Sequence, residues 1–215
     1  MPDKDPTIIK VLEWIYEKSL CPGVKGIKSA YQLAEQFNNK TNHLQTNIDA
    51  LIRAQNIQSA SSGFFLGLGG FITMPATLPA DITSTLFLQI RMILAIALMS
   101  GFDEKDDRVK LLVYSCLADT VEDEIIHEVK NQIVSNIAQT GITETIKNIS
   151  VSQATQIAIR RAQTTVAAKL TAHVGAKGGS HLTKVIPFIG GIVGATANTW
   201  STNKIGKRAK STFLS

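Results

Sequence analysis

The 215-residue chain has little charge, few aromatic side chains and only two cysteines. Charged residues make up 18% of the chain, below the roughly 25% of an average globular protein, while 44% of the residues are hydrophobic. This balance excludes a disordered chain and leaves ample material for a core. Cys21 and Cys116 lie far apart with no Cys-x-x-Cys spacing, which is typical of a reduced, cytosolic protein. The polar first ten residues lack a secretory apolar run, so we expect a cytoplasmic protein.

Motifs for catalysis and metal binding are also missing. The glycine-rich loop at 175–180 lacks the residue order of a phosphate-binding loop, and no Gly-x-Ser-x-Gly elbow is present. Glu124 and His127 have the Glu-x-x-His spacing of di-iron bundles, but the sequence holds no second copy. We therefore expect a protein that is not an enzyme and has neither a cofactor nor a metal ion.

The net charge of +5 is compatible with an anionic partner. Nucleic acid is a poor candidate, because the basic residues are not interleaved with aromatic ones and no recognition motif is visible. A membrane surface or a lipid-like apolar ligand is the favoured partner, and a protein partner stays open.

Apolar residues recur at helical spacing along most of the chain, and no stretch alternates like a strand. The first helix is predicted to begin at Asp5-Pro6 and to end before Cys21-Pro22-Gly23, and Ser29 suits the N-cap of the second. We expect an all-α fold, a single helical domain of about eight to nine helices. In it, the amphipathic helices of residues 1–60 pack on a core formed by residues 61–215.

Two segments of the chain, 54–80 and 185–203, carry no charge. The first contains Gly63-Phe-Phe-Leu-Gly67-Leu-Gly69-Gly70, and the second contains Gly190, Gly191 and Gly194. The Gly-x-x-x-Gly spacing within each lets two helix backbones approach closely. We expect a central apolar glycine-rich hairpin, formed by 63–74 and 82–100 and packed against 187–203.

These segments are nearly long enough to span a membrane. A spanning helix needs about 20 apolar residues, which the run Ile82–Ser100 nearly supplies. Arg91 lies near its middle, and a charge at the centre of a bilayer costs about 2.5–3.5 kcal/mol. Three interpretations stay open: a soluble helical core with tight glycine crossings, a peripheral or re-entrant membrane protein, and an integral pore former.

Polar residues inside the apolar segments are candidates for a buried ligand site. Asp81 suits a helix N-cap. Arg91 follows ten residues later, about 15 Å along the same helix, so the two cannot pair within one straight helix. Gln89 is expected to share the polar region of Arg91. The predicted buried polar set is Asp81, Gln89, Arg91 and Asn198.

Apolar and basic residues around the uncharged segments suggest how a membrane would be contacted. Basic residues next to an apolar segment attract anionic headgroups, each by about 1 kcal/mol, although they also suit the solvated end of a helix. The predicted headgroup contacts are Lys177, Lys184, Lys204, Lys207, Arg208 and Lys210. The predicted apolar contacts are Phe64, Phe65, Leu68, Phe71, Phe188 and Trp200.

Two blocks of the sequence resemble a known family. The stretch from Gly63 to Asp81, followed by Leu88-Gln89-Ile-Arg91, resembles the central signature of the EcsC protein family. Lys184-Val-Ile-Pro187-Phe-Ile-Gly190-Gly-Ile-Val-Gly194 resembles its closing block. The resemblance covers about residues 20–214. It implies an all-α fold near membranes, since the family is named after an operon that also encodes an ABC transporter, and it supplies no catalytic residues.

These observations together favour a non-enzymatic helical protein that makes reversible peripheral or re-entrant contact with a membrane, or binds a lipid. Two alternatives stay open. One is a membrane-inserting, pore-forming effector or toxin, and the other is a soluble scaffold that binds a protein partner.

Overall fold

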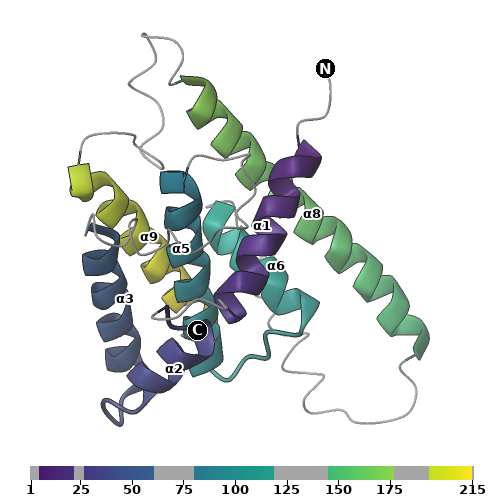
Figure 1. Cartoon of the computed structure of the whole chain (residues 1–215). Coiled ribbons are helices and arrows are strands. Elements are labelled where there is room, and N and C mark those ends of the chain that lie inside the picture. Colours follow the sequence, from purple (N-terminus) through teal and green to yellow (C-terminus); the bar gives the residue numbers. More distant parts are fainter. Residues whose placement is uncertain (1–4, 22–26, 61–79, 119–144, 177–193, 215) are drawn as a thin grey trace.

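The computed structural model describes residues 5–21, 27–60, 80–118, 145–176 and 194–214 (Figure 1). These residues contain seven helices and no strand, which confirms the all-α class. In chain order the helices are α1 (Asp5–Leu20), α2 (Ala30–Asn38), α3 (Leu44–Ala60), α5 (Ala80–Met99), α6 (Asp107–Ala118), α8 (Thr145–Ala176) and α9 (Gly194–Leu214).

Helix α5 lies at the centre of the fold. Helices α1, α2, α3, α6 and α9 all pack against it. Every side chain from Ile90 to Ala97 is at most 2% exposed. The stretch Ile82–Met99 is long and apolar enough to cross a membrane, but 89% of it is buried inside the protein. A helix that is apolar on all sides is stable in water only when its neighbours cover it, and these helices do so.

The remaining helices are arranged around α5 in two groups. Helices α3 and α9 pack against each other on one side, and α8 packs against α6 and α1 on the other (Figure 1). One hydrophobic core joins residues from Ile8 to Phe213. The ring of Phe102, just after α5, meets that of Phe213 edge-on at 5.2 Å between centroids. The N-terminal and C-terminal helices therefore share one core.

Local sequence signals account for the helix ends. The Ser29 side chain accepts a hydrogen bond from the backbone of Gln32, whose side chain in turn accepts one from the Ser29 backbone, so a full capping box opens α2. At the end of α5, Gly101 has φ of +84°, and the Phe102 backbone N–H returns to the Ala97 carbonyl at 3.0 Å. This is the glycine-dependent C-cap that lets the chain turn sharply out of a helix.

The structure differs from the sequence-based expectation near the C-terminus. We expected the packed segment to end at residue 203, but helix α9 begins at Gly194 and continues past that residue, through the basic residues, to Leu214. One face of those turns is buried, and burial of apolar side chains stabilises a helix that its polar composition alone does not predict. The first arm of the predicted hairpin, 63–74, lies outside the described residues.

The close helix crossing seen in the described residues also uses a different glycine. A Cβ placed on Gly206 of α9 would lie 2.9 Å from two side-chain carbons of Ile52 in α3, and 3.2 Å from the Met92 methyl carbon in α5. Gly206 is thus the point at which α9 approaches both neighbours. It does not belong to either Gly-x-x-x-Gly pair singled out in the sequence.

Candidate functional site

The predicted site residues fall into three groups. Helical positions with described side chains are Gln89, Arg91, Lys204, Lys207, Arg208 and Lys210. Helical positions whose side chains the structure does not describe are Asp81 in α5 and Asn198 and Trp200 in α9. Residues outside the described parts of the chain are Phe64, Phe65, Leu68, Phe71, Lys177, Lys184 and Phe188.

Arg91 is the centre of a buried polar cluster. Its side chain is 2% exposed. One terminal nitrogen donates to the Lys28 carbonyl at 3.0 Å, and the other donates to the amide oxygens of Gln55 at 3.0 Å and Gln58 at 3.1 Å. The guanidinium also lies over the Phe87 ring, 5.1 Å from its centroid. Burial lowers the pKa of Arg91 to about 10, which leaves the side chain charged at neutral pH.

Gln89 does not join this cluster. Its amide donates to the Ser201 hydroxyl of α9 at 3.3 Å, in a buried contact. Residues two apart on a helix point about 200° away from each other, so Gln89 faces α9 while Arg91 faces α3 and the segment before α2. The expected shared polar region of Gln89 and Arg91 is therefore not formed. The two residues tie the central helix to different neighbours.

The amide partners of Arg91 were not predicted from the sequence. Gln55 and Gln58 are three residues apart in α3, a spacing that places them on one side of a helix. Gln55 is 2% exposed. Two amides on one side of α3 were the available signal, but nothing in the sequence connects them to an arginine more than 30 residues away.

A second polar cluster joins α1, α6 and α8. The Glu13 carboxylate accepts hydrogen bonds from Lys110 of α6 and Gln163 of α8. The Tyr114 hydroxyl donates to the Leu12 carbonyl at 3.2 Å. Burial, followed by the charge of Glu13, raises the pKa of Tyr114 well above its ordinary value. This cluster holds three helices together, and the described residues contain no group of three or more His, Cys, Asp or Glu side chains arranged for a metal ion.

Two of the four basic residues of α9 lie on its outer side. Lys204 and Lys207 are exposed and Arg208 is partly buried. Lys210 forms an ion pair with Asp49 of α3 at 2.7 Å. The buried side of the same turns consists of Ser201, Thr202, Ile205, Gly206, Ala209, Thr212 and Phe213. Of the four described candidates for headgroup contact, Lys204 and Lys207 are therefore the most accessible to solvent.

Comparison with known proteins identifies the family of this chain. No curated protein and no solved structure matches the chain. The model of the EcsC protein family matches residues 9–214. That span includes the central helix α5 with Arg91, helix α3 and the segment before α2 that Arg91 contacts, and the basic helix α9. The chain therefore belongs to the EcsC protein family.

Proposed function

We propose that this protein associates reversibly with the surface of an anionic membrane and does not catalyse a reaction. The observation that carries the proposal is the composition of α9. This helix contains four basic residues and no acidic one, and Lys204 and Lys207 are exposed on it. Because α9 is anchored by a buried face, these lysines are displayed from a fixed surface rather than from a loose tail.

The position of the uncharged sequence supports the same proposal. The last turn of α3 and the first turns of α5 and α9 lie at the same end of the bundle (Figure 1). Residues 61–79 connect two of these ends, residues 185–193 lead into the third, and neither stretch carries a charge. Uncharged sequence is therefore joined to the described helices at the end of the bundle where α9 begins. Uncharged sequence together with a basic helix suits the interface of an anionic bilayer.

Peripheral contact fits the described helices better than insertion of α5. Inserting this helix would expose a packed core and break the hydrogen bonds of Arg91 to Gln55, Gln58 and the Lys28 carbonyl. It would also place a charge in the bilayer at a cost of about 2.5–3.5 kcal/mol. Contact through the outer side of α9 needs no rearrangement of the described helices. Dye leakage from vesicles tests for insertion as a pore, because a pore releases the dye and peripheral contact does not.

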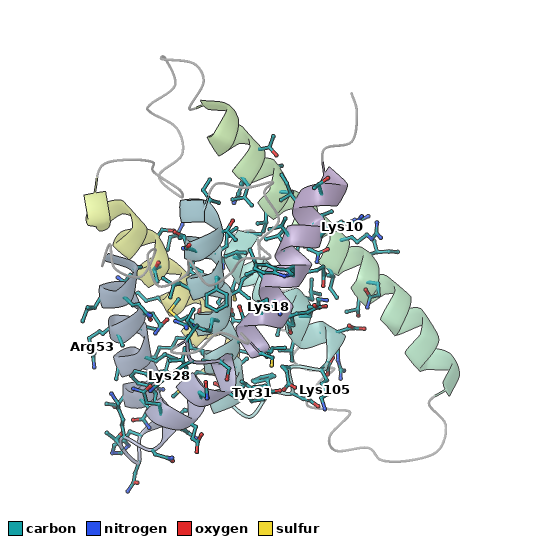
Figure 2. The ribbon with its side chains drawn as sticks, viewed as in Figure 1. Lys10, Lys18, Lys28, Tyr31, Arg53 and Lys105 are labelled. Carbon is teal, nitrogen blue, oxygen red and sulfur yellow. The ribbon has the colours of Figure 1, made fainter. Side chains whose placement is uncertain are left out.

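Co-flotation of the purified protein with liposomes tests the proposal. We expect flotation with anionic vesicles and not with neutral ones. We also expect loss of flotation at high salt, because the screening length of exposed charges falls from about 8 Å at physiological ionic strength to about 3 Å at 1 M salt. The double substitution Lys204→Glu/Lys207→Glu should abolish flotation. Lys10→Glu/Lys105→Glu makes the same change of net charge on exposed lysines of α1 and the α5–α6 turn, far from α9 (Figure 2), and should leave flotation intact.

Two results would overturn the proposal. Wild-type protein that stays with the soluble fraction at every lipid composition would exclude membrane contact and favour the scaffold alternative, to be pursued with a search for a protein partner. Equal losses in the two double variants would show that net charge, rather than α9, drives flotation.

A further inference from the structure

Helix α3 has an outer side that combines charged and apolar residues. Asp49, Arg53 and Ile57 follow one another at intervals of four, so they lie along one side of the helix. Arg53 is exposed and extends outward from α3 in Figure 2. Ile57 is 72% exposed, more than any other large hydrophobic side chain among the described residues. This side therefore combines a cation with an unusually exposed apolar residue.

Two contacts fix how α3 lies beside α9. Asp49 pairs with Lys210 at 2.7 Å, and Ile52 lies against Gly206. Residue numbers rise along α3 as they fall along α9, so the helices are antiparallel. The next turn of α3 contains Arg53, and it lies beside the turn of α9 that contains Lys207. The outer sides of the two helices therefore adjoin.

Helices α3 and α9 together are strongly positive. Helices α3 and α9 carry five basic residues, Arg53, Lys204, Lys207, Arg208 and Lys210, against the single acidic residue Asp49, which gives a net charge of 5 − 1 = +4. The Asp49–Lys210 pair lies where the two helices meet. Cations gathered beside an exposed isoleucine, with one acid among them, complement a surface that is anionic and has apolar material behind it.

We infer that the outer sides of α3 and α9 form one docking surface for an anionic bilayer, in which Arg53, Lys204 and Lys207 contact lipid phosphates and Ile57 enters the headgroup layer. This inference rests on the proposed function and adds the second helix and the orientation of the protein on the membrane. We call this set of four residues the α3–α9 face. A free phosphate or a soluble polyanion would pair with the cations but offers no apolar contact to Ile57. We therefore assign the surface to a bilayer.

Substitutions on α3, compared with the same substitutions on α8, test the inference. Arg53→Ala should weaken partitioning to anionic vesicles about fivefold, the value of one cation near such a surface. Ile57→Ser should weaken it about threefold through lost apolar contact. The matched controls are Arg160→Ala and Ile157→Ser, because Arg160 is exposed and Ile157 is 56% exposed on α8, on the other side of the bundle. Both controls should bind like the wild type.

A substitution of Asp49 should strengthen partitioning to vesicles, whereas the substitutions of Arg53 and Ile57 should weaken it. Asp49→Asn removes the one acid beside the α3–α9 face and releases Lys210, so partitioning should become about fivefold tighter. Thermal unfolding of each variant checks that the fold is kept. Inorganic polyphosphate, added as a competitor, separates the two sources of phosphate. Wild-type protein and Ile57→Ser should bind it equally, and only binding to vesicles should depend on Ile57.

The outcomes distinguish this inference from the proposed function. If the wild type floats and Lys204→Glu/Lys207→Glu does not, but Arg53→Ala and Ile57→Ser match their α8 controls, the membrane function stands and the α3–α9 face is wrong. If polyphosphate binding depends on Ile57 as strongly as vesicle binding does, the assignment to a bilayer is wrong.

Discussion

The guanidinium of Arg91 donates a hydrogen bond to the amide oxygen of Gln55 at 3.0 Å, across the buried interface between α5 and α3. With the bonds to Gln58 and the Lys28 carbonyl, it connects the central helix to two other parts of the chain. Burying a charge costs less free energy when its polar atoms are hydrogen-bonded, and both terminal nitrogens of Arg91 are hydrogen-bonded by these three oxygens. The one charged residue of the stretch Ile82–Met99 is thus held inside the protein.

Removal of the Arg91 side chain should therefore destabilise the fold. Arg91→Ala removes the donor from the buried oxygen of Gln55 and from the partly buried oxygen of Gln58, and we expect a loss of about 3 kcal/mol in the free energy of unfolding. Urea unfolding followed by circular dichroism measures it. Arg53→Ala, on the exposed side of α3, is the control and should change stability by less than about 0.5 kcal/mol. A loss below about 1 kcal/mol for Arg91→Ala would show that the cluster is not important for stability.

The close approach at Gly206 leads to a second prediction. Gly206→Ala should destabilise the protein by about 1–3 kcal/mol, because the new methyl group meets Ile52 at 2.9 Å, although alanine is the better helix former. Ile52→Ala removes both carbons that the methyl group would meet. The double variant should be less destabilised than the sum of the two single variants, as a double-mutant cycle of unfolding free energies would show. Strict additivity would mean that the two residues do not collide.

Gly101 should respond to substitution for a different reason. It has φ of +84°, and a Cβ built on it would meet nothing within 4 Å. Gly101→Ala should cost about 1–2 kcal/mol through backbone strain alone. Gly101→Asn should cost less, because asparagine tolerates left-handed conformations better. Equal losses for alanine and asparagine in urea unfolding would argue against strain as the cause.

The three tyrosines of the chain predict an alkaline limit to stability. Partial burial, then the hydrogen bond and charge of Glu104, raise the pKa of Tyr31 to about 12. Burial is the largest cause of raised pKa values at Tyr16 and Tyr114 as well. A raised folded-state pKa contributes stability that is full below the unfolded value of about 10 and is lost as the pH rises through the folded value.

Absorbance of tyrosinate during an alkaline titration checks this prediction. The native protein should show little tyrosinate at pH 10, where the unfolded chain is half ionised. The free energy of unfolding should fall as the pH rises from about 10 toward 12. Tyr31→Phe removes the Tyr31 contribution and should reduce the slope in that window. A native titration curve that coincides with that of the unfolded chain would contradict the raised pKa values.

Features that depend on neighbouring residues could be predicted from the sequence. The start of α1 at Asp5, the capping box at Ser29 and the glycine stop at Gly101 are local, because caps and turns involve residues a few positions apart. The all-α class followed from helical periodicity. Lys204 and Lys207 were singled out because they follow an uncharged segment. Their position on the exposed side of α9, a helix whose opposite side is buried, was not predicted, since a polar composition gives no sign of tertiary burial.

Features that depend on which helices meet could not be predicted. Arg53 and Ile57 look like ordinary exposed residues until α3 is placed beside α9, about 150 residues later in the chain. Gln89 and Arg91, two residues apart, point to different neighbours, and only the packing shows which ones. Among the described residues a close crossing falls at Gly206, which belongs to neither Gly-x-x-x-Gly pair, because contact between helices depends on the facing side chain, here Ile52, as much as on the glycine.

The sequence by itself determined that the chain is helical, where several helices begin and end, and that its longest apolar helix is long enough to span a bilayer. The tertiary structure alone decided that this helix is a core, because length and hydropathy are properties of one segment, whereas burial is a property of the helices around it. It also decided which cations face outward together, since a surface is formed by helices brought side by side through packing and not by residues adjacent in the chain.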